Sequence, residues 1–107
     1  YYDFLDIGLQ NSKRIGIVVG DVSGHGIGSA LFMAMARSLL HLRSTQPGTL
    51  SEIINDVNHQ LAIDLEDYGQ FMTLFYMIVD QQAQSINWIR AGHETGMVYD
   101  RCDDSFD

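Results

Sequence analysis

The residues best suited to chemistry in this 107-residue chain lie in one short run, Ile15 to Ala30. Its first part, Ile15 to Val22, is apolar and β-branched and contains a single carboxylate, Asp21, near its end. A glycine-dense turn with His25 follows, and an apolar helix is expected after it. Glycines let the backbone fold tightly at a point where side chains would block a ligand. The run therefore predicts a site for a hard cation or for a phosphate group.

Asp21 and His25 each have two interpretations from the residues alone. Asp21 is either a metal ligand at the end of a strand or an aspartate that caps the helix or turn of the glycine loop. His25 either contacts a phosphate, a metal-bound water or a leaving group, or it holds the turn through its ring nitrogens. For His25 we favour the structural role. The backbone is expected to require glycine, for a positive φ or for close packing at the helix start, at Gly24, Gly26 and Gly28.

Composition narrows the classes of partner. The formal net charge of −8 at pH 7 argues against nucleic acid and anionic membrane surfaces. The single cysteine, Cys102, excludes an internal disulfide framework and fits a reducing compartment, so we expect a cytoplasmic location. No apolar run approaches the roughly 20 residues that a membrane-spanning helix needs.

The strands expected on either side of this run occur in consecutive pairs along the chain. We expect strands at 1–7, 15–22, 71–79, 85–90 and 97–99, and helices at 28–45 and from 49 to a stop at Tyr68-Gly69. A polar turn at 11–14 joins the first two strands, and Thr49 with Glu52 forms a capping box for the second helix. The order β-β-α-α-β-β-β favours an α+β fold, an antiparallel sheet with helices packed on a face.

Four segments, in order along the chain, resemble the bacterial metal-dependent serine phosphatases of the PPM superfamily, in its stage II sporulation protein E branch. They are Tyr1-Tyr2-Asp3-Phe4, Gly20-Asp21-Val22-Ser23-Gly24-His25-Gly26, Phe71-Met72-Thr73-Leu74-Phe75-Tyr76 and Arg90-Ala91-Gly92-His93. The last is similar to an Asn-Ala-Gly-His turn of the family, with Arg90 where Asn is usual. The resemblance implies an antiparallel β-sandwich flanked by helices, with metals between the sheets at one edge. It identifies 1–107 as a partial, truncated domain of this kind.

The resemblance also implies roles for single residues. Asp21 would bridge two divalent cations, Mn²⁺ or Mg²⁺, and the backbone carbonyl of Val22 would add a ligand. The cations would activate a bridging water to attack phosphorus. Strand pairing is expected to place Asp3 close to Asp21. In the family, the aspartate of this segment that binds metal comes just before Tyr1, so Asp3 is expected beside the metal ligands and not as one of them. His93 is expected to order its turn rather than to touch substrate.

The function implied is a metal-dependent protein serine/threonine phosphatase in bacterial signalling. Its substrate would be a phosphorylated regulatory protein of the anti-sigma-factor-antagonist type, and a sensor or receiver domain would lie upstream. The family completes its metal centre with aspartates beyond Tyr99, so we expect 1–107 alone to lack activity. The alternative is a catalytically silent phosphatase-like module that binds a partner or scaffolds a signalling complex.

Overall fold

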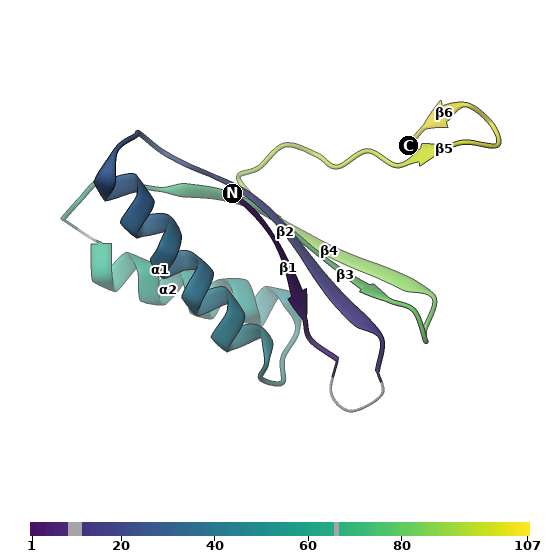
Figure 1. Ribbon diagram of the computed structural model, residues 1–107, viewed down its shortest axis with the longest axis horizontal. Helices are drawn as coiled ribbons and strands as arrows, with labels where there is room; N and C mark the ends of the chain where they lie inside the picture. The colour runs from purple at the N-terminus through teal and green to yellow at the C-terminus, as the bar shows by residue number, and fades with distance from the viewer. Residues whose placement is uncertain (9–11, 66) are drawn as a thin grey trace.

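A four-stranded antiparallel sheet with the strand order β1-β2-β3-β4 forms the centre of the fold (Figure 1). The computed structural model describes residues 1–8, 12–65 and 67–107. Its elements are β1 (Tyr2–Asp6), β2 (Arg14–Val22), α1 (Ile27–Ser44), α2 (Leu50–Leu65), β3 (Met72–Asp80), β4 (Ser85–Ala91), β5 (Tyr99–Asp100) and β6 (Ser105–Phe106). The expected α+β class is confirmed, as are the two antiparallel strand pairs.

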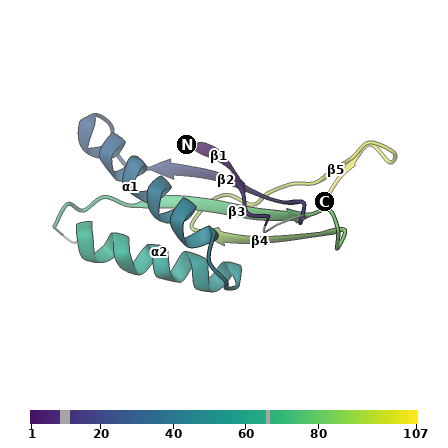
Figure 2. The same cartoon turned by 60° about the horizontal axis from the view of Figure 1, so that its bottom comes forward.

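The sheet has one face against the helices and one open face, because side chains alternate along each strand. Figures 1 and 2 show α1 and α2 side by side along the same side of the sheet. The core between these layers consists of Leu5, Val18, Leu40, Ile53, Val57, Leu74, Tyr76 and Ile78. On the open face, Ile15, Val19 and Trp88 keep 41%, 42% and 57% of their surface exposed. β2 is thus central in the sheet but buried on one face only.

Local signals explain where the helices begin. α1 follows Gly26, whose φ of 87° is a conformation that glycine adopts without strain. α2 begins with the predicted capping box, which is confirmed. The Glu52 backbone N–H donates to the Thr49 hydroxyl at 3.2 Å, and the Thr49 N–H donates to the Glu52 carboxylate at 2.7 Å. Within the described residues, no helix combines the length and the hydropathy that crossing a membrane requires.

The structure differs from the expected sandwich in what lies over the open face. Among the described residues the second sheet is only the β5–β6 hairpin, which Figure 1 shows away from the helices. The strand expected at 97–99 begins instead at Tyr99 and pairs with a short partner at Ser105–Phe106. Of the polar turn expected at 11–14, Asn11 lies outside the described residues, and Arg14 already belongs to β2.

Candidate functional site

Asp21 lies on the open face of the sheet, one residue before the end of β2. Its cross-strand partner in β3 is Thr73, and Val22, the last residue of β2, is paired with Met72. The Asp21 side chain is exposed and forms no hydrogen bond or ion pair with any residue that the structure describes. The N-cap of α1 is Gly26, without a side-chain bond, so Asp21 does not cap the helix. The carboxylate is therefore open to a cation.

Asp3 lies on the opposite face of the sheet from Asp21. Its partner in β2 is Val18, which points toward the helices and is completely buried. Val18 and Asp21 are three residues apart, and an odd step along a strand reverses the face. The hairpin therefore does not bring the two carboxylates together. This corrects the expectation that strand pairing places Asp3 close to Asp21.

Asp3 instead connects β1 to α1. Its carboxylate accepts hydrogen bonds from Arg37 Nε at 2.9 Å, His41 Nε2 at 2.6 Å and the Tyr1 hydroxyl at 3.1 Å. The Phe4 backbone N–H donates a further bond at 2.9 Å. Burial raises the pKa of Asp3, but the bonds from His41, Phe4 and Tyr1 and the charge of Arg37 outweigh it, so the pKa is lowered. These contacts give Asp3 a structural role.

Serine hydroxyls, rather than His25, hold the glycine loop between β2 and α1. Ser23 exchanges two bonds with Phe71: its N–H donates to the Phe71 carbonyl at 2.8 Å, and its hydroxyl accepts from the Phe71 N–H at 2.9 Å. The Ser29 hydroxyl donates to the Ser23 carbonyl at 2.9 Å and accepts from the Gln70 amide at 3.2 Å. The loop is thereby fixed to α1 and to the segment that leads into β3.

His25 is exposed in this loop and forms no hydrogen bond with the described residues. Gly24 and Gly26 on either side of it have φ values of 77° and 87°, which confirms that two of the loop glycines serve positive φ. The described residues therefore give the favoured structural role of His25 no hydrogen bond, and the role stays a prediction. Neither Ser23 nor Ser29 was predicted to hold the loop. The available signal for Ser29 was its hydroxyl in the first turn of a helix, where such groups bond to nearby backbone.

The turn after β4 adds polar side chains to the open face near Asp21. A hydrogen bond of 2.8 Å joins the Thr73 hydroxyl to His93 Nδ1 and connects the turn to β3, as expected of a residue that orders it. Gly92 has a φ of 67°, which lets the chain turn just after the strand. Arg90 shares the open face because its partner in β3, Phe75, is two residues from Thr73.

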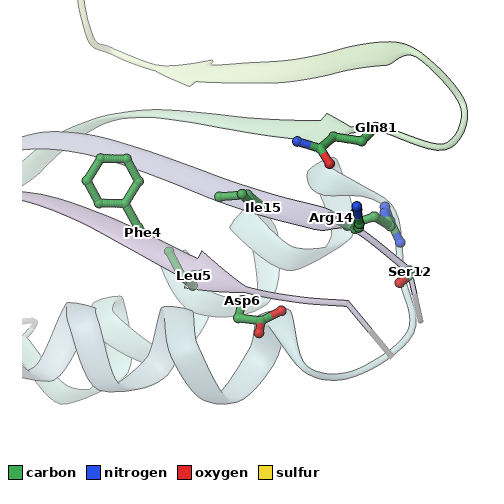
Figure 3. A pocket seen from close by; sticks show the side chains of 8 residues that line it. Phe4, Leu5, Asp6, Ser12, Arg14, Ile15 and Gln81 are labelled. Atoms are coloured by element: carbon green, nitrogen blue, oxygen red, sulfur yellow. The ribbon is translucent and has the colours of Figure 1, made fainter. Parts of the chain in front are cut away.

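A groove of about 570 Å³ lies at the other end of the β1–β2 hairpin (Figure 3). It is lined by Phe4, Leu5, Asp6, Ser12, Lys13, Arg14, Ile15 and Gln81. Arg14 begins β2, and Asp21 lies seven residues further along it, which is about 24 Å in an extended strand. The groove is therefore separate from the Asp21 site. No group of three His, Cys, Asp or Glu side chains is arranged to hold a metal in the described part of the chain.

Known proteins similar to this chain identify its family. The family model described as stage II sporulation protein E matches residues 11–105. Protein IcfG of Synechocystis sp. is 32% identical, over 86% of this chain and 19% of that protein. Phosphoserine phosphatases RsbU and RsbP of Bacillus subtilis are 27% and 30% identical, over 99% and 84% of this chain. The chain spans 30% of RsbU and 23% of RsbP. It belongs to the stage II sporulation protein E family.

Proposed function

We propose that this chain is part of a metal-dependent protein serine/threonine phosphatase. The observation that carries the proposal is the Asp21 carboxylate, which is exposed, free of bonds to the described residues, and fixed at a strand end beside the glycine loop. Two relatives, RsbU and RsbP, are phosphoserine phosphatases, which supports the reaction class.

The donors at this point suit Mn²⁺ or Mg²⁺. The Asp21 carboxylate and the Val22 carbonyl are hard oxygen donors, which these cations prefer. Strand register supplies a further argument: Tyr1 exchanges two backbone bonds with Gly20, at 3.0 and 2.9 Å. If the antiparallel pairing continued by one residue, the position before Tyr1 would lie opposite Asp21, with its side chain on the same face of the sheet. An aspartate occurs at that place in the family pattern, so the register supports a shared cation site.

The chemistry proposed is phosphate ester hydrolysis by water. A divalent cation, when bound at Asp21, would provide a water nucleophile at neutral pH and neutralise charge on the phosphoryl group. Asp21 would hold the cation through its carboxylate, and Val22 would hold it through its carbonyl oxygen. His25, exposed at the loop, would donate a proton to the serine or threonine oxygen as it leaves, and the attacking water would lose one proton to the solvent. Asp3 takes no part, because it faces the helices.

The proposed substrate is a phosphorylated regulatory protein of the anti-sigma-factor-antagonist type, in cytoplasmic signalling with an upstream sensor or receiver domain. The alternative, a silent phosphatase-like binding module, is favoured by the lack of a three-ligand cluster among the described residues. Hydrolysis of p-nitrophenyl phosphate by the protein with its natural ends separates the two functions. We expect Mn²⁺-dependent turnover that Asp21→Asn abolishes and that Asp64→Asn, on an exposed position of α2, preserves. A folded protein without turnover at any Mn²⁺ concentration would favour the binding module.

A further inference from the structure

The turn from Arg90 to Thr95 carries two restrained side chains on the Asp21 side of the sheet. Arg90 donates to the Thr95 hydroxyl at 2.6 Å, and Nδ1 of His93 is bonded to Thr73. Thr73 is the cross-strand neighbour of Asp21. Adjacent strands lie about 4.8 Å apart, so β4 runs roughly 10 Å from β2, with Thr73 of β3 between them. Arg90 and Asp21 therefore share the open face with one strand between them.

Arg90 keeps its positive charge uncompensated by any carboxylate in the described residues. Three other arginines pair with carboxylates: Arg14 with Asp80, Arg37 with Asp3 and Arg43 with Asp56. Arg90 instead bonds to a neutral hydroxyl and presents a guanidinium on the open face of an acidic chain. A planar guanidinium binds phosphate oxygens through two parallel hydrogen bonds. Arg90 is thus suited to a dianion that a cation at Asp21 would also attract.

His93 adds a directed hydrogen-bond donor. We assign the Thr73 hydroxyl as the donor to Nδ1, which leaves the ring proton on Nε2. When the ring is protonated, Nε2 carries a proton as well. The half-buried ring is therefore an N–H donor at the same end of the sheet as Arg90.

We propose that Arg90 and His93, restrained by Thr95 and Thr73, form a subsite for the phosphoryl oxygens of a phosphate monoester. The subsite belongs to the proposed phosphatase site and rests on that function. It would receive the side of the phosphoryl group that faces away from a cation at Asp21.

The test is a titration of the protein, in its natural length, with inorganic phosphate in EDTA, followed by the ¹⁵N resonances of arginine Nε and of the histidine rings. Loss of a charge-assisted pair of bonds weakens binding by roughly tenfold or more. We expect that effect for Arg90→Gln and a smaller one for Arg90→Lys. Arg101→Gln, which removes an equal charge from the β5–β6 turn, should leave phosphate affinity unchanged. In wild type, the His93 ring resonances should move with phosphate and report protonated Nε2.

Steady-state kinetics supply the second arm. Arg90→Gln should raise KM for p-nitrophenyl phosphate by about tenfold, with a much smaller change in kcat. Equal phosphate affinity and equal KM in Arg90→Gln and wild type would overturn the subsite, as would a wild-type protein that binds no phosphate. Failure of the phosphatase function itself has a different signature, because the folded wild-type protein would then show no Mn²⁺-dependent turnover, whatever its affinity for phosphate.

Discussion

A methyl group added at Gly20 tests how closely β2 packs against β3 beside Asp21. The Cβ of an alanine there would collide with Met72 Cε and would lie 2.9 Å from the Thr73 carbonyl oxygen and 3.1 Å from Leu74 Cδ1. The end of the Met72 side chain can rotate away. The Thr73 carbonyl is backbone, so relief of that contact requires the paired strands to shift.

The free energy of unfolding should fall by about 1 to 2 kcal/mol in Gly20→Ala. Overpacking of a filled site costs about 1–3 kcal/mol. Alanine loses less backbone entropy than glycine on folding, which offsets about 0.5–1 kcal/mol of this cost. The remaining loss is a large part of the roughly 5–15 kcal/mol by which such domains are stable. The same shift would displace β2 at Asp21 and Val22, so Mn²⁺ affinity should fall with stability.

Urea denaturation followed by the fluorescence of Trp88, the single tryptophan, measures this change, because its ring stacks on Phe75 of β3 at 5.7 Å. Gly28→Ala is the matched control. Its Cβ would meet only the flexible Gln70 amide, at 3.4 Å, and a helical alanine should be as stable as glycine or more so. If Gly20→Ala unfolds within about 0.5 kcal/mol of wild type, the close packing argued here is refuted.

Two further predictions concern the supports of the fold. Because the pKa of Asp3 is lowered in the folded state, its contribution is present above its unfolded pKa and is lost as pH falls through the folded value. Asp3→Asn should therefore lower the free energy of unfolding at pH 7 by about 1.5–3 kcal/mol and reduce the acid sensitivity, measured by urea denaturation at several pH values. An unchanged acid response would contradict this. Thr49→Ala should cost about 1 kcal/mol, whereas Glu52→Gln, which keeps an acceptor, should cost less in the same assay. Equal stability of Thr49→Ala and wild type would contradict the cap.

Elements were predictable where their signals are local. Thr49 and Glu52 stand three residues apart, and that spacing alone predicts the cap that the structure contains. Both helices and the four long strands were likewise found within about two residues of their ends, because helical and alternating patterns extend over each whole element. The β5–β6 hairpin was missed in part, since strands of two residues leave too little pattern.

Side-chain placement at the site depended on contacts between distant segments. Asp3 and Asp21 lie on opposite faces of the sheet. A one-residue change in the register of β1 against β2 would have put them on the same face. His25 and His93 both follow a glycine, but of these two rings only that of His93 has a hydrogen-bond partner among the described residues. The restraint comes from Thr73, twenty residues away in sequence, and no local spacing predicts such a bond.

Direct measurement of Mn²⁺ binding tests the central claim, that Asp21 holds the cation of a phosphatase site. Electron paramagnetic resonance of free Mn²⁺ during titration of the protein, with its natural ends, gives the affinity without relying on turnover. We expect Asp21→Asn to weaken Mn²⁺ binding at least tenfold, a loss of about 1.4 kcal/mol or more, while Asp64→Asn leaves it unchanged. Equal Mn²⁺ affinity in Asp21→Asn and wild type would contradict the account.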